Sequence, residues 1–277
     1  NAWSQIIGML LRFLKKALVF SAFFCGSVFY HVAQAGNDDC ELPKQGWAQD
    51  NIKHIADGDT VTLTDGTHLR FIGINTPEID HKALHNSDPF AVEAKDYLAK
   101  LIKKSNGSVK WLAGAERTDK YKRHLAHPFT ADGINITAAL LEQGLGYWIH
   151  FPPNTAYSTC YRRAEQMARQ HQQGIWSGAG PVKRQKSLGK QTGFVLYQGQ
   201  LTRYKLHQKG IWIELDDGRL SLTGNASVAQ HFDKKMLGRL KGKGVEVRGW
   251  IYKNRVYKNK GLQARMSLKS PEQIQAL

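Results

Sequence analysis

Short apolar runs separated by Asp-Gly turns constrain the fold of this chain more than any other feature. One strand is expected to start at Asn51 and to end at the turn over 56–59. A second alternates apolar residues with threonines over 61–63, and a third runs over 69–74. The turn Asp65-Gly66 joins the second strand to the third. Because Asp-Gly suits the tight turn of a hairpin, this segment predicts neighbouring short strands.

A helix, two further strands and two more helices are expected after these strands. Apolar residues three and four positions apart predict a helix over 89–104, and strands are expected over 109–112 and 125–129. Asn135 can cap the next helix, and a last helix is expected over 157–172. Three strands, a helix, two strands and then helices is the order of a five-stranded OB-type barrel with attached helices.

The C-terminal part of the chain predicts a second, smaller barrel. Strands are expected over 193–201, 210–215 and 219–223, a helical segment over 226–240, and strands over 245–252 and 262–268. Three strands, a helix and two strands is again the OB order. We therefore expect a mainly β protein with helices (α+β), with one barrel domain over 51–177, a basic linker over 178–191 and a second barrel domain over 192–277.

Almost all of the excess positive charge of the chain belongs to its C-terminal part. The 277 residues carry 39 Lys and Arg against 23 Asp and Glu, a net charge of +16. From Pro181 onward there are 20 basic and 6 acidic residues, whereas residues 36–180 hold 16 and 17. An excess of this size indicates a polyanion or an anionic surface as partner, and it assigns that contact to the second module.

Residues 1–35 have the order of a signal peptide. Three basic residues precede an apolar run over 17–32, which Ala33-Gln34-Ala35 follows. We expect cleavage there, a mature N-terminal segment over 36–50, and export to the periplasm or the medium. An uncleaved anchor is the alternative, although the apolar run is shorter than the ~20 residues that span a bilayer.

Signal cleavage would remove Cys25 and leave Cys40 and Cys160. An exported chain meets an oxidising compartment, where such a pair can form one disulfide. Two unpaired thiols are the alternative, and the sequence leaves both open.

Three segments of the first module hold most of its residues suited to phosphate chemistry. They are Asp57-Gly58-Asp59-Thr60-Val61, then Leu69-Arg70-Phe71-Ile72-Gly73-Ile74-Asn75-Thr76-Pro77-Glu78, then Arg117-Thr118-Asp119-Lys120-Tyr121-Lys122-Arg123. In this order and at this spacing they resemble the signature segments of the staphylococcal nuclease (thermonuclease) family. The similarity extends from about Asn51 to the ending Gly174-Ile175-Trp176-Ser177.

Phosphodiester hydrolysis needs cations on the phosphate and a group that prepares the attacking water. Guanidinium groups fork onto phosphate oxygens and stay charged, which suits Arg70 and Arg123 to phosphate binding. The resemblance makes these the two phosphate-binding arginines, and it makes Glu78 the carboxylate that activates or orients the water. Tyr121 would lie near a phosphate or a base.

The resemblance also implies a Ca²⁺ site. Calcium prefers oxygen donors, and the implied ligands are Asp59, Asn75 and the backbone carbonyl of Thr76, with Asp57 behind them. The family usually carries a second metal-binding aspartate where this chain has Asn75. An amide oxygen still coordinates calcium but brings no charge, so we predict weaker affinity and a calcium requirement in the millimolar range of extracellular sites.

The second module interleaves aromatic side chains with lysines and arginines. Its segments Leu240–Trp250 and Ala264–Leu268 are loosely similar to OB-type nucleic-acid-binding modules found after some bacterial nuclease domains. Four residues are expected to hold substrate on an exposed basic hairpin: Tyr252, Tyr257, Lys258 and Lys260. A merely solubilising surface, or anchorage to anionic lipids, is the alternative.

Together these features predict an exported nuclease that hydrolyses DNA and RNA with little sequence preference. The first barrel would use Ca²⁺ and, like the family, leave 3′-phosphate ends. The second barrel would hold the strand, with single-stranded regions preferred. The alternative is a weak or inactive nuclease fold that acts as a nucleic-acid-binding protein of the envelope. Asn75 favours this alternative, whereas Arg70, Glu78 and Arg123 favour the enzyme.

Overall fold

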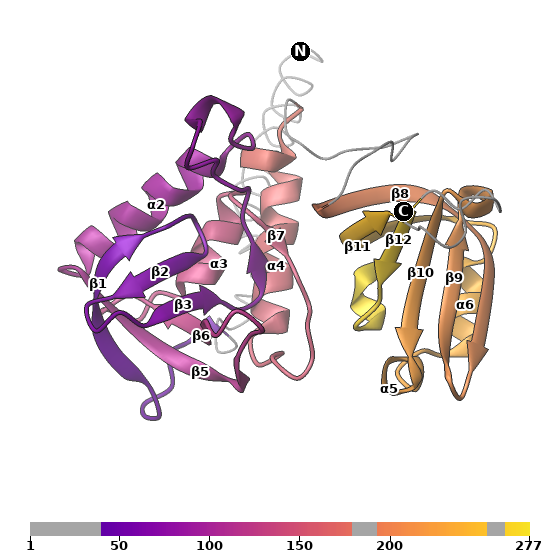
Figure 1. The fold of residues 1–277 in the computed structure, drawn as a ribbon, viewed down its shortest axis with the longest axis horizontal. Coiled ribbons are helices and arrows are strands. Elements are labelled where there is room, and N and C mark those ends of the chain that lie inside the picture. Colours follow the sequence, from indigo (N-terminus) through magenta and orange to yellow (C-terminus); the bar gives the residue numbers. More distant parts are fainter. Residues whose placement is uncertain (1–39, 179–192, 254–263) are drawn as a thin grey trace, which may run out of the picture. The chain divides into compact units, whose positions relative to one another are not determined.

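The computed structural model describes residues 40–178, 193–253 and 264–277. They form two β-barrels with attached helices, so the expected mainly β class with helices is confirmed (Figure 1). The contacts within the chain place both barrels in one compact unit. Across this described part no helix is long and apolar enough to cross a membrane. The expected signal peptide and most of the expected linker lie outside the described residues.

Five strands close the first barrel in the ring order β1-β2-β3-β6-β5. They are β1 (Ala48–Ile55), β2 (Thr60–Leu63), β3 (His68–Phe71), β5 (Ser108–Thr118) and β6 (His124–Phe129). Neighbouring strands are antiparallel except β3 and β6, which are parallel. Val61, Leu63, Leu69 and Phe71 fill the core, and because side chains alternate along a strand, Arg70 lies on the other face of β3.

A separate pair of very short strands lies beside the barrel. The strands β4 (Ile74–Asn75) and β7 (Tyr147–Trp148) are antiparallel, and Asn75 lies opposite Tyr147. The third strand therefore ends at Phe71 and not at Ile74 as expected, since Ile74 belongs to β4. The sequence did not predict β7, because two residues are too few to show a period.

Three helices pack on the first barrel. They are α2 (Ala91–Lys104), α3 (Ile136–Glu142) and α4 (Ser158–Gln170), with 3₁₀ turns at η2 (Leu84–Asn86) and η3 (Gly174–Trp176). The apolar side chains that predicted α2, including Ala94, Leu98 and Leu101, lie in the core. Asn135 caps α3 as expected, because its Oδ1 accepts a hydrogen bond of 3.0 Å from the amide of Ala138.

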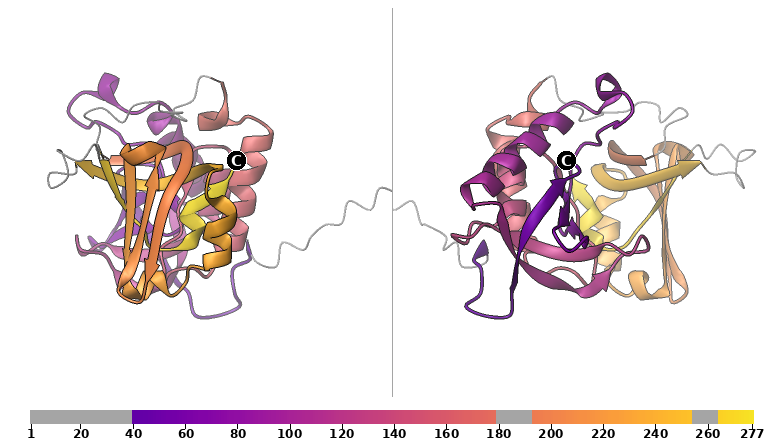
Figure 2. Two further views of the ribbon diagram at one scale, coloured as in Figure 1. Left: turned by 90° about the vertical axis from the view of Figure 1, so that its right-hand side faces the viewer. Right: turned by 60° about the vertical axis from the view of Figure 1, so that its left-hand side comes forward.

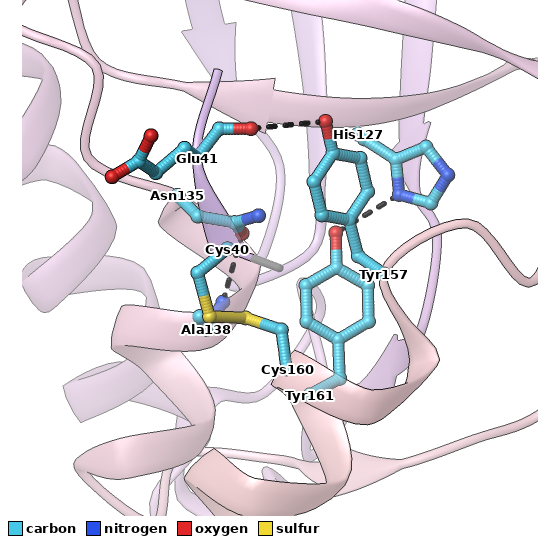
Figure 3. The surroundings of a disulfide bond; sticks show 8 residues. All are labelled: Cys40, Glu41, His127, Asn135, Ala138, Tyr157, Cys160 and Tyr161. Carbon is cyan, nitrogen blue, oxygen red and sulfur yellow. Dashed lines mark hydrogen bonds between the residues drawn. A yellow bond between two sulfur atoms is a disulfide. The ribbon is translucent and has the colours of Figure 1, made fainter. Parts of the chain in front are cut away.

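A disulfide joins Cys40 to Cys160 of α4, with the two Cα atoms 5.3 Å apart (Figure 3). Cys160 belongs to the buried core, and Cys40 packs against it. Beside the disulfide, the hydroxyl of Tyr157 donates to the carbonyl of Glu41 at 3.2 Å. These contacts fix the segment before β1 to a helix that begins more than a hundred residues later.

The second barrel repeats the strand order of the first. Its ring is β8-β9-β10-β12-β11, in which only β10 and β12 are parallel, and β13 also pairs with β11. The strands are β8 (Gly193–His207), β9 (Gly210–Leu215), β10 (Leu220–Asn225), β11 (Gly244–Lys253), β12 (Ala264–Ser267) and β13 (Ile274–Ala276), with 3₁₀ turns at η4 (Asp216–Gly218) and η6 (Pro271–Gln273). Figure 2 shows this barrel from two further sides.

Two short helices replace the single helical segment expected over 226–240. They are α5 (Ala226–Ala229) and α6 (Lys234–Leu240). Between them Phe232 is buried in the barrel core, and the carboxylate of Asp233 accepts a hydrogen bond of 2.9 Å from the amide of Lys235. The helical segment is interrupted here because Asp233 caps a new helix.

Four charged side chains meet where α4 packs on β11. Arg248 donates to both carboxylate oxygens of Glu165, at 2.8 and 3.0 Å, and to Glu246 at 3.1 Å. Arg169 donates to both oxygens of Glu246, at 2.7 and 3.1 Å. Arg248 also donates to the carbonyl of Trp148 at 2.8 Å. Since Arg248, Glu165 and Glu246 are buried, this ion cluster fixes β11 to α4 and β7.

Candidate active site

The Asp57-Gly58-Asp59 turn positions one buried carboxylate beside the end of β4. The side chain of Asp57 accepts a hydrogen bond from the amide of Asp59 at 3.0 Å. Asp59 is buried and accepts from the amide of Thr76 at 2.9 Å. A Cβ atom at Gly58 would lie 2.7 Å from Ala94 and 2.8 Å from Thr76, so this approach requires glycine.

Arg70 links Asp59 to Asn75. One guanidinium nitrogen lies 3.0 Å from the carboxylate of Asp59 and 3.4 Å from the side-chain oxygen of Asn75. The other donates to the carbonyl of Phe71 at 2.8 Å. Residues 59, 70 and 75, which the sequence predicted to share a site, are therefore in direct contact.

Negative charge is crowded around this arginine. Burial, together with repulsion from Asp59, raises the pKa of Asp57 to about 7. Loss of solvent and repulsion from Asp59 also raise the pKa of Glu78, and the positive charges of Arg70 and Arg123 partly oppose this rise. Asp57 and Glu78 are therefore both exposed to the negative charge of Asp59.

Glu78 lies after β4, at the mouth of the site. Its amide donates to the carboxylate of Asp88 at 3.2 Å, and its carbonyl accepts from the amide of Asp88 at 2.9 Å. These two bonds hold the backbone of Glu78, whereas its side chain is exposed. A carboxylate that extends from a fixed backbone segment, has a raised pKa and is reached by solvent is suited to accept a proton from water.

Asp119 positions Arg123 in the loop between β5 and β6. One oxygen of its carboxylate accepts from the amides of Tyr121 and Arg123, at 2.9 and 3.0 Å, and the other accepts from Nε of Arg123 at 2.8 Å. The guanidinium of Arg123 lies 5.5 Å from the ring of Tyr121, which is exposed. No role was expected for Asp119, although this residue stands inside the third signature segment.

The oxygen donors near Asp59 are suited to calcium. The described residues contain no group of three or more His, Cys, Asp or Glu side chains placed to hold a metal ion. They do bring together one carboxylate (Asp59), one side-chain amide (Asn75) and the Thr76 carbonyl, which accepts from the Asn75 amide at 3.4 Å. Burial is the main cause of the raised pKa values of Asp57 and Glu78, and repulsion from Asp59 adds to it; a cation would offset both effects. The donor set therefore fits Ca²⁺, with one carboxylate.

A cavity of about 270 Å³ opens beside Glu78 and is lined by both barrels. The first barrel contributes Asn75, Thr76, Pro77, Glu78, Asp88 and Tyr147, and the second contributes Gly193, Phe194, Val195, Leu196 and Trp250. Phe194 and Trp250 were not expected at the site. No sequence signal indicates which strands of the second barrel meet the first.

The four residues expected on a basic hairpin of the second barrel are only partly described. Tyr252 is 40% exposed on β11, and its hydroxyl is hydrogen-bonded to that of Ser267 at 2.7 Å. Tyr257, Lys258 and Lys260 lie outside the described residues.

Comparison with known proteins relates the first barrel to nucleases. The family described as staphylococcal nuclease homologue matches residues 68–178. That is the family indicated by the three sequence segments. The match includes Arg70, Glu78 and Arg123 and ends before the second barrel.

Curated relatives are similar over roughly the same share of the chain. The SPbeta prophage-derived endonuclease YokF of Bacillus subtilis is 30% identical over 135 residues, which is 47% of this chain and 45% of the relative. The endonuclease YncB of the same organism is 31% identical over 47% of this chain and 63% of its own length. An uncharacterized endonuclease of Escherichia coli O157:H7 is 24% identical, over 47% and 78%. The chain thus spans less than two thirds of the first two relatives.

Proposed function

We propose that this chain is a nuclease that hydrolyses phosphodiester bonds of DNA and RNA with little sequence preference. The observation that carries the proposal is one site in which Asp59 is paired with Arg70 and acts electrostatically on Glu78. Arg70 and Glu78 lie within residues 68–178, which match the staphylococcal nuclease homologues. The names of the relatives, all endonucleases, support the same reaction class.

In the proposed reaction Glu78 takes a proton from a water molecule as the water oxygen attacks phosphorus. The bond from phosphorus to the 5′ oxygen breaks, its electron pair stays on that oxygen, and the oxygen takes a proton from solvent. The products are a 3′-phosphate and a 5′-hydroxyl. The raised pKa of Glu78 suits the task, because a base works best when its pKa is near the operating pH.

The two arginines would bind the phosphate oxygens on which charge accumulates. Arg70 is held by Asp59 and by the carbonyl of Phe71, and Arg123 by Asp119, so neither has to be ordered when substrate binds. The exposed ring of Tyr121 would contact the same phosphate or its base.

Ca²⁺ is the proposed cofactor, held by Asp59, Asn75 and the carbonyl of Thr76, with Asp57 behind them. When bound, it would add positive charge next to the phosphate. Because Asn75 is neutral, we expect this site to saturate only at millimolar calcium.

The proposal also assigns functions to the second barrel and to the N-terminal residues. We assign strand binding, with single-stranded regions preferred, to the basic second barrel, including Tyr252 and the undescribed Tyr257, Lys258 and Lys260. We also assign export to the periplasm or the medium to the signal-like residues 1–35. The Cys40–Cys160 disulfide suits an oxidising compartment.

The test is digestion of single- and double-stranded DNA and RNA by the purified chain, with Ca²⁺ or with chelator, followed by analysis of the new ends. We expect calcium-dependent cutting of all four substrates and fragments with 5′-hydroxyl and 3′-phosphate ends. Equal cutting in chelator would refute the calcium site, and 5′-phosphate ends would refute the proposed direction of cleavage.

Asn75 also supports a second candidate function, a nucleic-acid-binding protein with an inactive nuclease fold. Its amide takes the place of a metal-binding carboxylate, and under this second candidate function the calcium affinity is too low for turnover. Tight binding of the four substrates without cutting, at any calcium concentration up to the millimolar range, would select this candidate.

A further inference from the structure

The cavity beside Glu78 has an aromatic wall that the reaction proposed above does not use. Trp250 of β11 and Phe194 of β8 line the same cavity as Glu78 and Thr76. Its volume of about 270 Å³ is slightly below the ~300–1,000 Å³ of small-molecule pockets. A space of that size next to a phosphate-binding site suits one nucleotide and not a long segment of strand.

The position of Trp250 follows from the buried ion cluster. Glu246, Arg248 and Trp250 alternate along β11 with the core residues Val247 and Ile251, so the three side chains lie on the outer face of the barrel. Glu246 and Arg248 are buried against α4 and β7 by their ion pairs with Arg169 and Glu165. Trp250 is the next residue on that face, and it is held at the edge of the contact between the barrels.

Phe194 and Phe151 pack against the ring of Trp250, with their ring planes inclined to the indole plane. The Trp250 ring centre lies 4.9 Å from that of Phe194, with an angle of 72° between the planes, and 5.6 Å from that of Phe151, with an angle of 43°. Neither neighbour stacks parallel on the indole, and 38% of the residue is exposed. A large aromatic ring that is fixed but partly open can stack on a nucleobase, whichever base it is.

We infer that Trp250 of the second barrel, with Phe194 beside it, is a substrate-binding residue that stacks on a nucleobase next to the phosphate to be cut. The inference rests on the proposed nuclease function, since it takes Glu78 as the neighbouring reactive group. It gives the second barrel a role inside the active-site cleft, in addition to charge attraction along the strand. Stacking is tolerant of sequence, which agrees with a nuclease of little sequence preference.

The experiment measures binding and cleavage of a short probe that reaches little beyond the cleft. Binding of a fluorescein-labelled thymidine trinucleotide is followed by anisotropy with Ca²⁺ present, in full-length chains that carry Glu78→Gln to prevent cleavage. Trp250→Ala, Trp250→Leu and Trp250→Phe are compared in this background. Trp212→Ala is the matched control, because Trp212 is a half-buried tryptophan on β9 that does not line the cavity.

We expect the Ala and Leu variants to bind the trinucleotide about tenfold more weakly, as base stacking on an aromatic ring predicts. The Phe variant should keep most of the affinity and Trp212→Ala all of it. With Glu78 restored, the Ala variant should show the loss mainly as a higher KM. Trinucleotide binding by the Leu or Ala variant equal to that of its parent would overturn the inference, as would the absence of binding by the parent.

Failure of the inference and failure of the proposed function give different results. Glu78-dependent cutting together with unchanged binding by Trp250→Ala removes the stacking role and leaves the nuclease. Binding that depends on Trp250 in a chain that never cuts removes the nuclease and leaves a nucleotide-binding cleft. Circular dichroism and thermal unfolding of each variant confirm that the barrels stay folded.

Discussion

At the scale of single residues, the site places three carboxylates around one arginine that is already paired. Arg70 is in contact with Asp59, yet the pKa values of Asp57 and Glu78 remain raised. Burial raises both pKa values first, and repulsion from Asp59 adds to the rise. A cation at this place would offset both effects, and a neutral Asn75 adds no further repulsion. An aspartate at that position would add a further negative charge to the group when no metal is bound.

Asn75→Asp tests that account. The added charge should lower the calcium concentration at half-maximal cutting roughly tenfold, since ligand charge sets the affinity of oxygen sites. It should also lower the melting temperature in chelator, because one more carboxylate then repels Asp59. Calcium titrations of activity and thermal unfolding with and without chelator measure both effects. An unchanged calcium midpoint would exclude Asn75 from the site.

A buried histidine predicts how stability depends on pH. Burial lowers the pKa of His127 to about 4. Its Nδ1 is hydrogen-bonded to the hydroxyl of Tyr161 at 2.9 Å (Figure 3), and its Nε2 has no hydrogen-bond partner among the residues that the structure describes. Above pH ~6.5 the residue is neutral in both the folded and the unfolded chain. As pH falls from there to 4, only the unfolded chain gains the proton, so the free energy of unfolding should fall by up to about 3 kcal/mol.

Urea unfolding of His127→Gln between pH 7 and pH 4 checks this prediction. The variant should lose most of the acid sensitivity, whereas His81→Gln, which changes an exposed loop histidine, should keep it. The same pH dependence in His127→Gln as in the parent would assign the acid sensitivity to other groups.

At the scale of elements, the sequence predicted what local patterns determine and missed what long-range contacts determine. The Asp-Gly turns, the period of α2 and the cap at Asn135 are local, and the structure contains all three. The pair β4–β7 depends on the meeting of residues more than seventy positions apart, so no window of sequence shows it. The break between α5 and α6 was missed because the Asp233 cap lies inside a continuous helical pattern.

The site residues also fall into two groups, those that a local motif indicates and those that only long-range contacts bring to the site. Arg70, Asn75 and Glu78 stand in one motif, and the fold brings Asp59 to them through the β2–β3 hairpin. Phe194 and Trp250 reach the cavity through the contact between α4 and β11. That contact depends on two pairs of charges, Glu165 with Arg169 and Glu246 with Arg248, whose segments are far apart in the sequence.

The disulfide gives a prediction at this scale. Joining Cys40 to Cys160 closes a loop of about 120 residues, and cross-links of this kind typically stabilise a domain by about 2–4 kcal/mol. The paired Cys40→Ser and Cys160→Ser variant should unfold at correspondingly lower urea concentration. Reductant should have the same effect on the parent and none on the variant. Equal stability of the two chains would show that the cross-link contributes nothing.

At the scale of the whole molecule, the excess charge and the reactive groups belong to different barrels. The part of the chain that holds the first barrel, residues 36–180, is close to neutral, whereas the residues from Pro181 onward carry the positive excess. A polyanion that is attracted by the second barrel is brought close to the site of the first barrel when the two barrels are held together. The buried cluster of Arg248, Glu165, Glu246 and Arg169 supplies that connection.

Arg248→Met should therefore uncouple the barrels. It leaves two carboxylates buried with one arginine between them, and breaking a buried pair in this way costs about 3–5 kcal/mol. We expect calorimetry to show one unfolding transition in the parent and two in the variant. Lys205→Met, which removes a charge from β8, is the control and should keep one transition. A single transition at the parent's temperature in Arg248→Met would contradict this account of the interface.

The most direct test of the central claim is the rate of DNA cutting by Glu78→Gln beside that of the parent chain, at saturating calcium. Replacing the carboxylate by an amide keeps size and shape but removes the proton acceptor. The proposed mechanism predicts that kcat falls by about 10²–10⁴-fold while trinucleotide binding and melting temperature stay close to those of the parent. Cutting by Glu78→Gln at the parent's rate would contradict the assignment of this site as the active site.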